Sequence, residues 1–129
     1  MLRNERDVML AERIFEDISV VEKRATHFSM TEELFCGDRS FEGEIAYDAI
    51  MNPVYRIVED ACHLSGDLMN AYPSFEWREM RGFRNFVAHG YGAIDRRIAW
   101  HVIETNLPEL KSIVKEVLSE KDGEERRDP

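Results

Sequence analysis

The chain has 129 residues, 43% of them hydrophobic, so it can form one globular domain with a packed core but not two. Its formal net charge is −9, from 17 Lys and Arg against 26 Asp and Glu, which argues against indiscriminate binding to nucleic acid or anionic membranes. No apolar run has the length of a membrane span, and the first residues lack the apolar core of a signal peptide, so we expect a cytoplasmic protein without a membrane segment.

The N-terminal half of the sequence predicts helices that face other helices. Between residues 5–25 apolar side chains recur every three or four positions, which is typical of an amphipathic helix. Ser29 is followed three residues later by a glutamate, as in a capping box, which predicts a short helical turn that Gly37 ends. A second long helix is expected over residues 41–68, and Pro53 should kink it or divide it in two.

The next helix carries an unusual set of polar side chains. Ser74, after a proline, offers a start, and Gly90 offers a stop. Between them one apolar stripe repeats at intervals of three and four, formed by Trp77, Met80, Phe83 and Val87. Arg84 should therefore lie where a buried face meets a more hydrated one, with Asn85 and His89 on the adjoining face.

The C-terminal part predicts two more helices and a polar tail. Asp95 can cap a helix, and the sequence around Pro108 should separate it from a last amphipathic helix. No segment alternates with period two, so the order of elements indicates an all-α bundle. We expect a helical domain over residues 1–118, followed by a charged, disordered tail over residues 119–129.

Candidate functional side chains are concentrated around the third of these helices. Residues 84–91 place a guanidinium, an imidazole and a phenol within eight positions, and Tyr91 stands between two glycines as if displayed. Residues 76–97 hold five arginines against three acidic residues, which makes this segment cationic in an acidic chain. Besides Arg84, the residues in it that could bind a nucleic acid such as RNA are Arg78, Arg81, Arg96 and Arg97.

The sequence offers little to support a metal or cofactor site. Asp60 and His63 are three residues apart, as are His101 and Glu104, but the matching inward carboxylates of a bundle metal site are not evident. Phosphate-binding Gly-rich loops and nucleophile elbows are also missing from the sequence. Cys36 and Cys62 have no metal-knuckle spacing, and we expect reduced, packed thiols. We therefore predict no metal and no cofactor.

These residues together resemble the HepT-like HEPN family. The resemblance is carried by Trp77, the string Arg84-Asn85-x-x-x-His89-x-Tyr91, Ile94-Asp95, Trp100 and Leu107-Pro108-x-Leu110. It implies an all-α HEPN bundle of four to five helices, a homodimer, and the toxin half of a toxin–antitoxin pair whose antitoxin is a minimal nucleotidyltransferase. It also implies metal-independent RNA cleavage by Arg84 and His89, with Asn85 in support, and silencing by adenylylation of Tyr91.

Two classes of function remain open at this stage. An imidazole can transfer protons and a guanidinium can grip a phosphate in a bidentate fork, which suits an endoribonuclease acting on tRNA or mRNA. The alternative is a non-catalytic helical partner, or a nucleotide-binding domain, that docks with the nucleotidyltransferase. The net charge of −9 favours the alternative slightly, because an acidic nuclease must attract RNA through a small local patch.

Overall fold

The chain folds into a bundle of helices. The computed structural model describes residues 4–89 and 94–127. Within these ranges the chain forms α-helices and one π-helical turn and contains no strand, which confirms the predicted all-α fold. The elements in chain order are α1 (Glu5–His27), α2 (Glu32–Gly37), α3 (Phe41–Cys62), α4 (Gly66–Ala71), α5 (Trp77–His89), α6 (Arg96–His101), the π-helical η1 (Val102–Asn106) and α7 (Leu107–Arg127).

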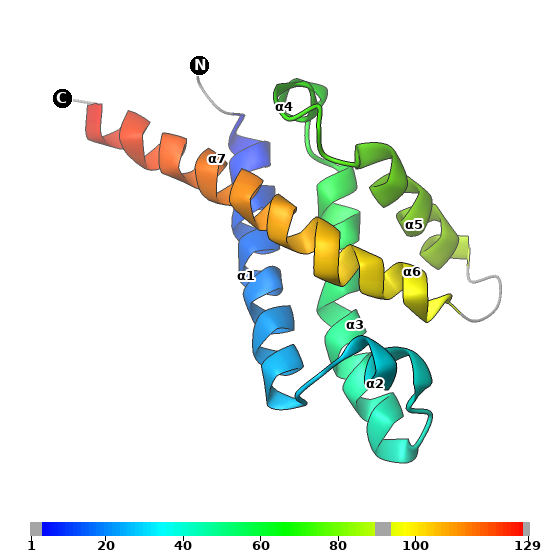
Figure 1. The fold of residues 1–129 in the computed structure, drawn as a ribbon. Helices are drawn as coiled ribbons and strands as arrows, with labels where there is room; N and C mark the ends of the chain where they lie inside the picture. Colours follow the sequence, from blue (N-terminus) through cyan, green and yellow to red (C-terminus); the bar gives the residue numbers. More distant parts are fainter. Residues whose placement is uncertain (1–3, 90–93, 128–129) are drawn as a thin grey trace.

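The two long helices α1 and α3 form the centre of the bundle. They pack along each other, α7 crosses α1 on one side, and α5 packs along α3 on the other (Figure 1). The chain direction reverses from α3 to α5, so the C-terminal end of α3 lies beside the first turns of α5 (Figure 1). None of the helices in the described ranges is long and apolar enough to cross a membrane.

The apolar stripes predicted from the sequence meet in one core. Most of its fully buried side chains come from α1, α3 and α7, and they include Ile14, Ile50, Ile57, Leu110 and Val114, together with Met80 of α5, Phe35 of α2 and Leu68 of α4. Burying each such side chain contributes about 1.5–3 kcal/mol to folding. On α5, Met80 and Phe83 are buried and Trp77 and Val87 are partly buried, which confirms the predicted stripe.

Pro53 does not divide the second long helix, which was one of the two effects predicted for it. α3 continues unbroken past Pro53, which is buried between Met51 and Val54 in the core. Apolar burial on both sides of the proline outweighs the one backbone hydrogen bond that it removes. The chain leaves helical geometry only after Cys62, so the expected single element over residues 41–68 is α3 followed by α4.

The start of α4 is fixed by a polar contact with the start of α1. Ser65 caps α4 by accepting a hydrogen bond from the backbone N–H of Leu68, at 3.1 Å. The backbone N–H of Ser65 donates to the buried carboxylate of Asp7 at 2.8 Å, and the Ser65 hydroxyl donates to the same carboxylate. This contact connects residues 58 positions apart and satisfies a carboxylate that is only 3% exposed.

Two predicted helix starts also lie elsewhere. Thr31, rather than Ser29, caps α2 by accepting a hydrogen bond from Leu34 N–H at 3.2 Å, while Ser29 has a positive φ of 49° in the preceding turn. α5 begins at Trp77 rather than directly after Ser74. There the indole N–H donates to the carbonyl of Tyr72 at 2.9 Å, so a side chain ties the preceding turn to the helix.

The C-terminal helices form one nearly continuous rod. Asp95 caps α6 as predicted, accepting from Arg97 N–H at 2.9 Å. The expected interruption near Pro108 is absent, because the π-helical turn η1 leads directly into α7. α7 runs to Arg127 and so includes residues of the tail that we expected to be disordered, where Lys, Glu and Arg are good helix formers.

Arg96 links three helices from the inside and is not available as an RNA contact. Its guanidinium donates to both carboxylate oxygens of Glu44, at 2.8 and 3.0 Å, and to the carbonyl of Phe35 at 3.3 Å. The same group lies 3.6 Å from the ring centroid of Tyr47. With its side chain only 7% exposed, Arg96 is a structural residue, which corrects the sequence-based expectation.

We predict that Arg96→Met lowers the free energy of unfolding by about 2–3 kcal/mol. The variant removes the charged donor and leaves the Phe35 carbonyl and the Glu44 carboxylate without it. Urea denaturation measures the change. Arg97→Met is the matched control, because Arg97 is the exposed neighbour and should stay within about 0.5 kcal/mol of wild type. Equal stability of the two variants would contradict the structural role of Arg96.

Candidate functional site

An ion pair between α3 and α5 fixes the arginine of the motif. Arg84 Nε donates to Glu59 Oε2 at 2.8 Å, and Arg84 Nη2 donates to Glu59 Oε1 at 3.2 Å. This is a bidentate contact in which one side of the guanidinium faces the carboxylate. The side chains are 36% and 48% exposed, so the pair stands at the protein surface, as the stripe border predicted for Arg84.

The remaining donors of Arg84 determine what else it can bind. Arg84 Nη1 donates to the amide oxygen of Asn85 at 3.3 Å. A guanidinium carries five N–H groups, and these contacts engage three of them, which leaves one on each terminal nitrogen. Each terminal nitrogen can therefore still donate to an anion such as phosphate while Glu59 is bound on the Nε–Nη2 side.

The charges of the pair stabilise each other. Hydrogen bonding from Arg84 lowers the pKa of the Glu59 carboxyl below its ordinary value. Hydrogen bonding to Glu59 raises the pKa of Arg84 in turn. Both groups are thus charged at neutral pH, and the carboxylate offsets much of the positive field that Arg84 would otherwise present to an incoming anion.

A small hollow adjoins the ion pair along the groove between α3 and α5. Its volume is about 180 Å³. The hollow is lined by Tyr55, Val58, Glu59, Arg84, Val87 and Ala88. Its wall is mostly apolar, so the Arg84–Glu59 pair supplies the charged groups at its border.

His63 belongs to the same polar cluster. Its Nδ1 lies 2.8 Å from the backbone carbonyl oxygen of Glu59 and 3.7 Å from Glu59 Oε1. No sequence pattern pointed to Glu59, and His63 stood out only for its spacing from Asp60. A partial signal was present, because Glu59 and His63 are four residues apart and are therefore neighbours on the surface of α3.

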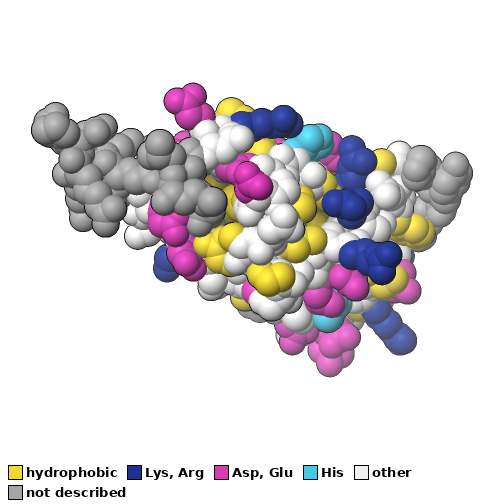
Figure 2. Space-filling view, turned by 90° about the horizontal axis from the view of Figure 1, so that it is seen from above, with side chains coloured by type: hydrophobic (Ala, Val, Ile, Leu, Met, Phe, Trp, Pro, Cys, Tyr) yellow, Lys and Arg dark blue, Asp and Glu magenta, His cyan; other side chains and the backbone are white. Residues whose placement is uncertain are grey.

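The other predicted site residues fall into three groups. Arg78, Arg81 and Asn85 are exposed on α5, and Arg97 is exposed on α6. Arg96 is buried. The side chain of His89 and the whole of Tyr91 lie outside the described residues. In the view from above, Lys and Arg side chains gather on the half of the face away from the C-terminal end of α7, with acidic side chains beside them (Figure 2).

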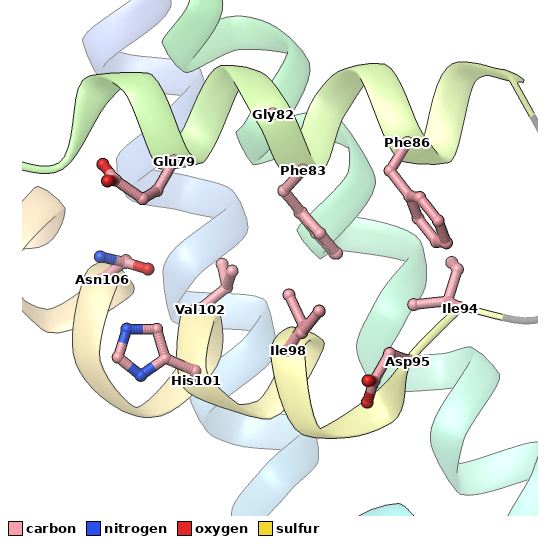
Figure 3. Close-up of a pocket in the computed structure, with 10 residues that line it drawn as sticks. All are labelled: Glu79, Gly82, Phe83, Phe86, Ile94, Asp95, Ile98, His101, Val102 and Asn106. Atoms are coloured by element: carbon pink, nitrogen blue, oxygen red, sulfur yellow. The ribbon is translucent and has the colours of Figure 1, made fainter.

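A second, apolar hollow lies on the other side of α5. Its volume is about 360 Å³, and side chains of α5 and of the α6–η1 segment point into it from opposite sides (Figure 3). The hydrophobic lining comes from Phe83, Phe86, Ile94, Ile98 and Val102. Phe86 and Ile98 are 42% and 54% exposed, which is unusual for large apolar side chains beside one cavity.

The residues considered for a metal site take part in separate contacts. Asp60 is buried and pairs with Arg13 at 3.1 Å, while His101 lies 3.6 Å from Glu76. Burial raises the pKa of the Asp60 carboxyl. In the described ranges no three His, Cys, Asp or Glu residues come together as a metal-binding group. Cys36 and Cys62 are free and partly buried, and burial raises the pKa of both thiols.

The fold and the site define a small helical protein with a positioned surface arginine between two helices. A family model described as "Ribonuclease HepT-like" matches residues 25–117. The chain therefore belongs to the HepT-like ribonuclease family, and this membership supports a ribonuclease-type function. No solved structure matches the chain at a significant level.

Curated relatives resemble the chain at moderate identity. "Probable ribonuclease HepT" of Thermococcus cleftensis is 25% identical over 111 residues, covering 86% of this chain and 93% of that protein. "Putative RNase MJ1380" of Methanocaldococcus jannaschii is 29% identical over 66 residues, covering 51% of this chain and 61% of that protein. "Putative RNase TTE0752" of Caldanaerobacter subterraneus is 32% identical over 62 residues, covering 48% of this chain and 55% of that protein.

We predict that Arg84→Ala raises the pKa of Glu59 toward that of an ordinary glutamate, because its main hydrogen-bond donor is lost. In the wild type the pKa of Glu59 is lower in the folded state than in the unfolded state, where it is about 4.3. The ion pair therefore stabilises the fold fully at pH values above about 4.3, and this stabilisation is lost as the pH falls through the folded-state pKa. Carboxyl-detected NMR titration measures the change. In Arg56→Ala, which removes an exposed arginine paired with Asp17, Glu59 should titrate as in wild type.

Proposed function

We propose that the protein is a metal-independent endoribonuclease and the toxin of a toxin–antitoxin pair, with Arg84 and His89 as its catalytic residues. The observation that carries the proposal is the geometry of Arg84, which Glu59 holds on one side while each of its terminal nitrogens keeps one N–H donor. Arg84 is the arginine of the motif by which the chain resembles its family, and that membership supports a ribonuclease-type function. The substrate is RNA, with tRNA and mRNA as the candidate classes.

The chemistry needs no group outside the chain and the RNA. The 2′-hydroxyl of the substrate loses its proton to a base, and its oxygen attacks the adjacent phosphorus while the bond to the 5′-oxygen breaks. The 5′-oxygen takes up a proton, and the products are a 2′,3′-cyclic phosphate and a 5′-hydroxyl. Arg84 would bind the phosphate oxygens as negative charge increases on them, and His89 would transfer a proton.

A second copy of the chain is part of the proposal. Residues five positions apart on a regular helix are rotated by about 140° and displaced by about 7.5 Å, so the motif spacing alone does not bring an Arg and a His together on one helix. Two copies meeting through α5 could bring the two groups together. The hollow beside Phe86 and Ile98 supports this face as the contact, because it exposes apolar side chains on the motif helix itself (Figure 3).

Regulation by adenylylation of Tyr91 completes the proposal. Tyr91 follows His89 by two residues and stands between Gly90 and Gly92 in the sequence. Transfer of AMP from ATP by a partner nucleotidyltransferase would form a bond from the phenol oxygen to phosphorus and release pyrophosphate. The added phosphodiester is negative and would compete with an RNA phosphate for Arg84.

The alternative function is a non-catalytic partner domain. One specific observation favours it: Glu59 already neutralises Arg84, in a chain whose net charge is −9. A site of this kind would bind RNA weakly and could serve mainly for docking with the nucleotidyltransferase. The two functions differ in whether the purified protein cleaves RNA.

We predict that the purified protein cleaves single-stranded or loop RNA in the presence of EDTA and leaves 2′,3′-cyclic phosphate ends. Arg84→Ala should lower the rate by about 10²–10³ and His89→Ala by about 10²–10⁴, because one removes the anion clamp and the other a proton carrier. Gel assays and end-group analysis measure both effects. Arg56→Ala is the control, since Arg56 is also an exposed, ion-paired arginine but lies on α3, and its partner is Asp17.

The outcomes separate the two functions. Circular dichroism should show all three variants folded, because each change lies at the surface or at the end of a helix. RNA cleavage by His89→Ala at the wild-type rate would contradict the catalytic assignment. A wild type without activity, but with tight binding to the nucleotidyltransferase, would support the partner-domain function.

We predict that the wild type has the mass of a dimer at micromolar concentration and that Phe86→Asp shifts it to a monomer. A charge beside the apolar hollow would have to be buried in the contact without a partner. Size-exclusion chromatography with light scattering measures the masses. The control is Phe41→Asp, which places the same charge at an exposed phenylalanine in the first turn of α3 and should remain dimeric.

A further inference from the structure

The proposed reaction requires two proton transfers, one from the 2′-hydroxyl and one to the 5′-oxygen. The motif supplies a single imidazole per chain. Any second proton carrier must lie close to the group that binds the phosphate. Among the described residues, a second titratable side chain near Arg84 could fill this role.

His63 lies at the required place. Its Nδ1 is 3.7 Å from Glu59 Oε1, and Arg84 Nη2 is 3.2 Å from the same oxygen atom. These two distances limit the separation of His63 Nδ1 and Arg84 Nη2 to at most 6.9 Å. A phosphate bound by Arg84 and the sugars on either side of it span a comparable distance, so the imidazole is close enough to act on one of their oxygens.

The contacts of His63 also determine which ring nitrogen is available. Nδ1 lies 2.8 Å from the carbonyl oxygen of Glu59, which can only accept a hydrogen bond. Nδ1 must therefore carry a hydrogen, so in the neutral ring Nε2 is the unprotonated nitrogen. The side chain is 42% exposed, so a substantial part of the ring is open to solvent and to a substrate.

Charged groups surround the ring on the two helices that form the groove. Glu59 and Asp60 come from α3 itself, and Arg84 from α5. The exposed Arg13 of α1 pairs with the buried Asp60. The carboxylate of Glu59 thus bridges a guanidinium that can hold a phosphate and an imidazole that can transfer a proton.

We propose that His63 is a second proton-transfer residue of the ribonuclease site, held beside Arg84 by Glu59. This inference rests on the proposed function and adds a catalytic residue to it. Nε2 of His63 carries the proton of one of the two transfers, taking it from the 2′-oxygen or giving it to the 5′-oxygen. The other transfer is made by the imidazole of His89. One histidine gains the proton that the 2′-oxygen loses and the other gives a proton to the 5′-oxygen, so no proton is gained or lost overall.

A structural role of His63 must be separated from this one, because the hydrogen bond to the Glu59 carbonyl also caps the end of α3. His63→Asn separates the two roles. The asparagine amide can replace Nδ1–H as the donor to that carbonyl, but it has no group at the position of Nε2. His27→Asn is the matched control, since His27 is an exposed histidine in the last turn of α1, at the opposite end of the bundle (Figure 1).

The test measures RNA cleavage and its pH dependence in the full-length protein. His63→Asn should lower kcat by about 10²–10⁴ with little change in KM, keep the melting temperature of wild type, and lose one limb of the pH–rate profile. His27→Asn should match wild type in all three. Added imidazole should restore part of the activity of His63→Ala, as expected when a missing proton carrier is replaced from solution.

The results that would overturn the inference are distinct from those that overturn the proposed function. An active wild type together with an equally active His63→Asn, showing an unchanged pH profile, would reduce His63 to a cap and leave the proposed function standing. Loss of activity in His63→Ala but not in His63→Asn would have the same meaning. A wild type that cleaves no RNA would overturn both.

Discussion

The candidate site depends on the packing of α5 against α3 in opposite directions. The apolar stripe of α5 buries Met80 and Phe83, and this burial fixes both the rotation of the helix and its position along α3. With these two variables set, Arg84 meets Glu59 across the groove. A rotation of α5 by one residue, about 100°, would move Arg84 away from Glu59 and bring Met80 out of the core. Hydrophobic packing of α5 against α3 therefore determines the positions at which Arg84 and Glu59 meet.

Glu59 has two opposite effects on the arginine that it holds. The bidentate contact restricts a long side chain that would otherwise sample many rotamers, so part of the entropy cost of gripping a phosphate is met before binding. The same carboxylate repels the phosphate and offsets the charge of the guanidinium. An acidic chain with such a site would select ligands by geometry more than by charge, and would bind few polyanions without discrimination.

Sequence periodicity predicted the elements whose stability comes from one-sided burial. The stripes of α1 and α5 and the cap at Asp95 followed from local patterns of three or four residues. The break after Cys62 did not, because it depends on a contact between Ser65 and Asp7, which are 58 positions apart. The continuation of α3 through Pro53 could not be predicted for the same reason. The local preference of proline for ending a helix is overridden by apolar burial to which other helices contribute.

The candidate functional residues differ in the same way in how far the sequence could predict them. The motif identified Arg84 because one helix displays it, but its partners on α3 became visible only when two helices were placed together. Arg96 shows the converse case. Its charge suggested a nucleic-acid contact, whereas Glu44, Tyr47 and the Phe35 carbonyl enclose it inside the bundle. Charge can be counted from a sequence, but exposure depends on tertiary packing.

The π-helical turn η1 sets the phase between the two ends of the C-terminal rod. A π-turn holds one residue more than the α-helical turn it replaces, so α6 and α7 present faces that a uniform α-helix would not align. Ala99 of α6 and Leu110 of α7 are both fully buried across this turn. Loss of a single residue from η1 would turn α6 by about 100° against α7 and carry Arg96 out of its enclosure. Insertions and deletions in η1 should therefore be tolerated far less than substitutions, because only a change of length alters the rotation of α6 relative to α7.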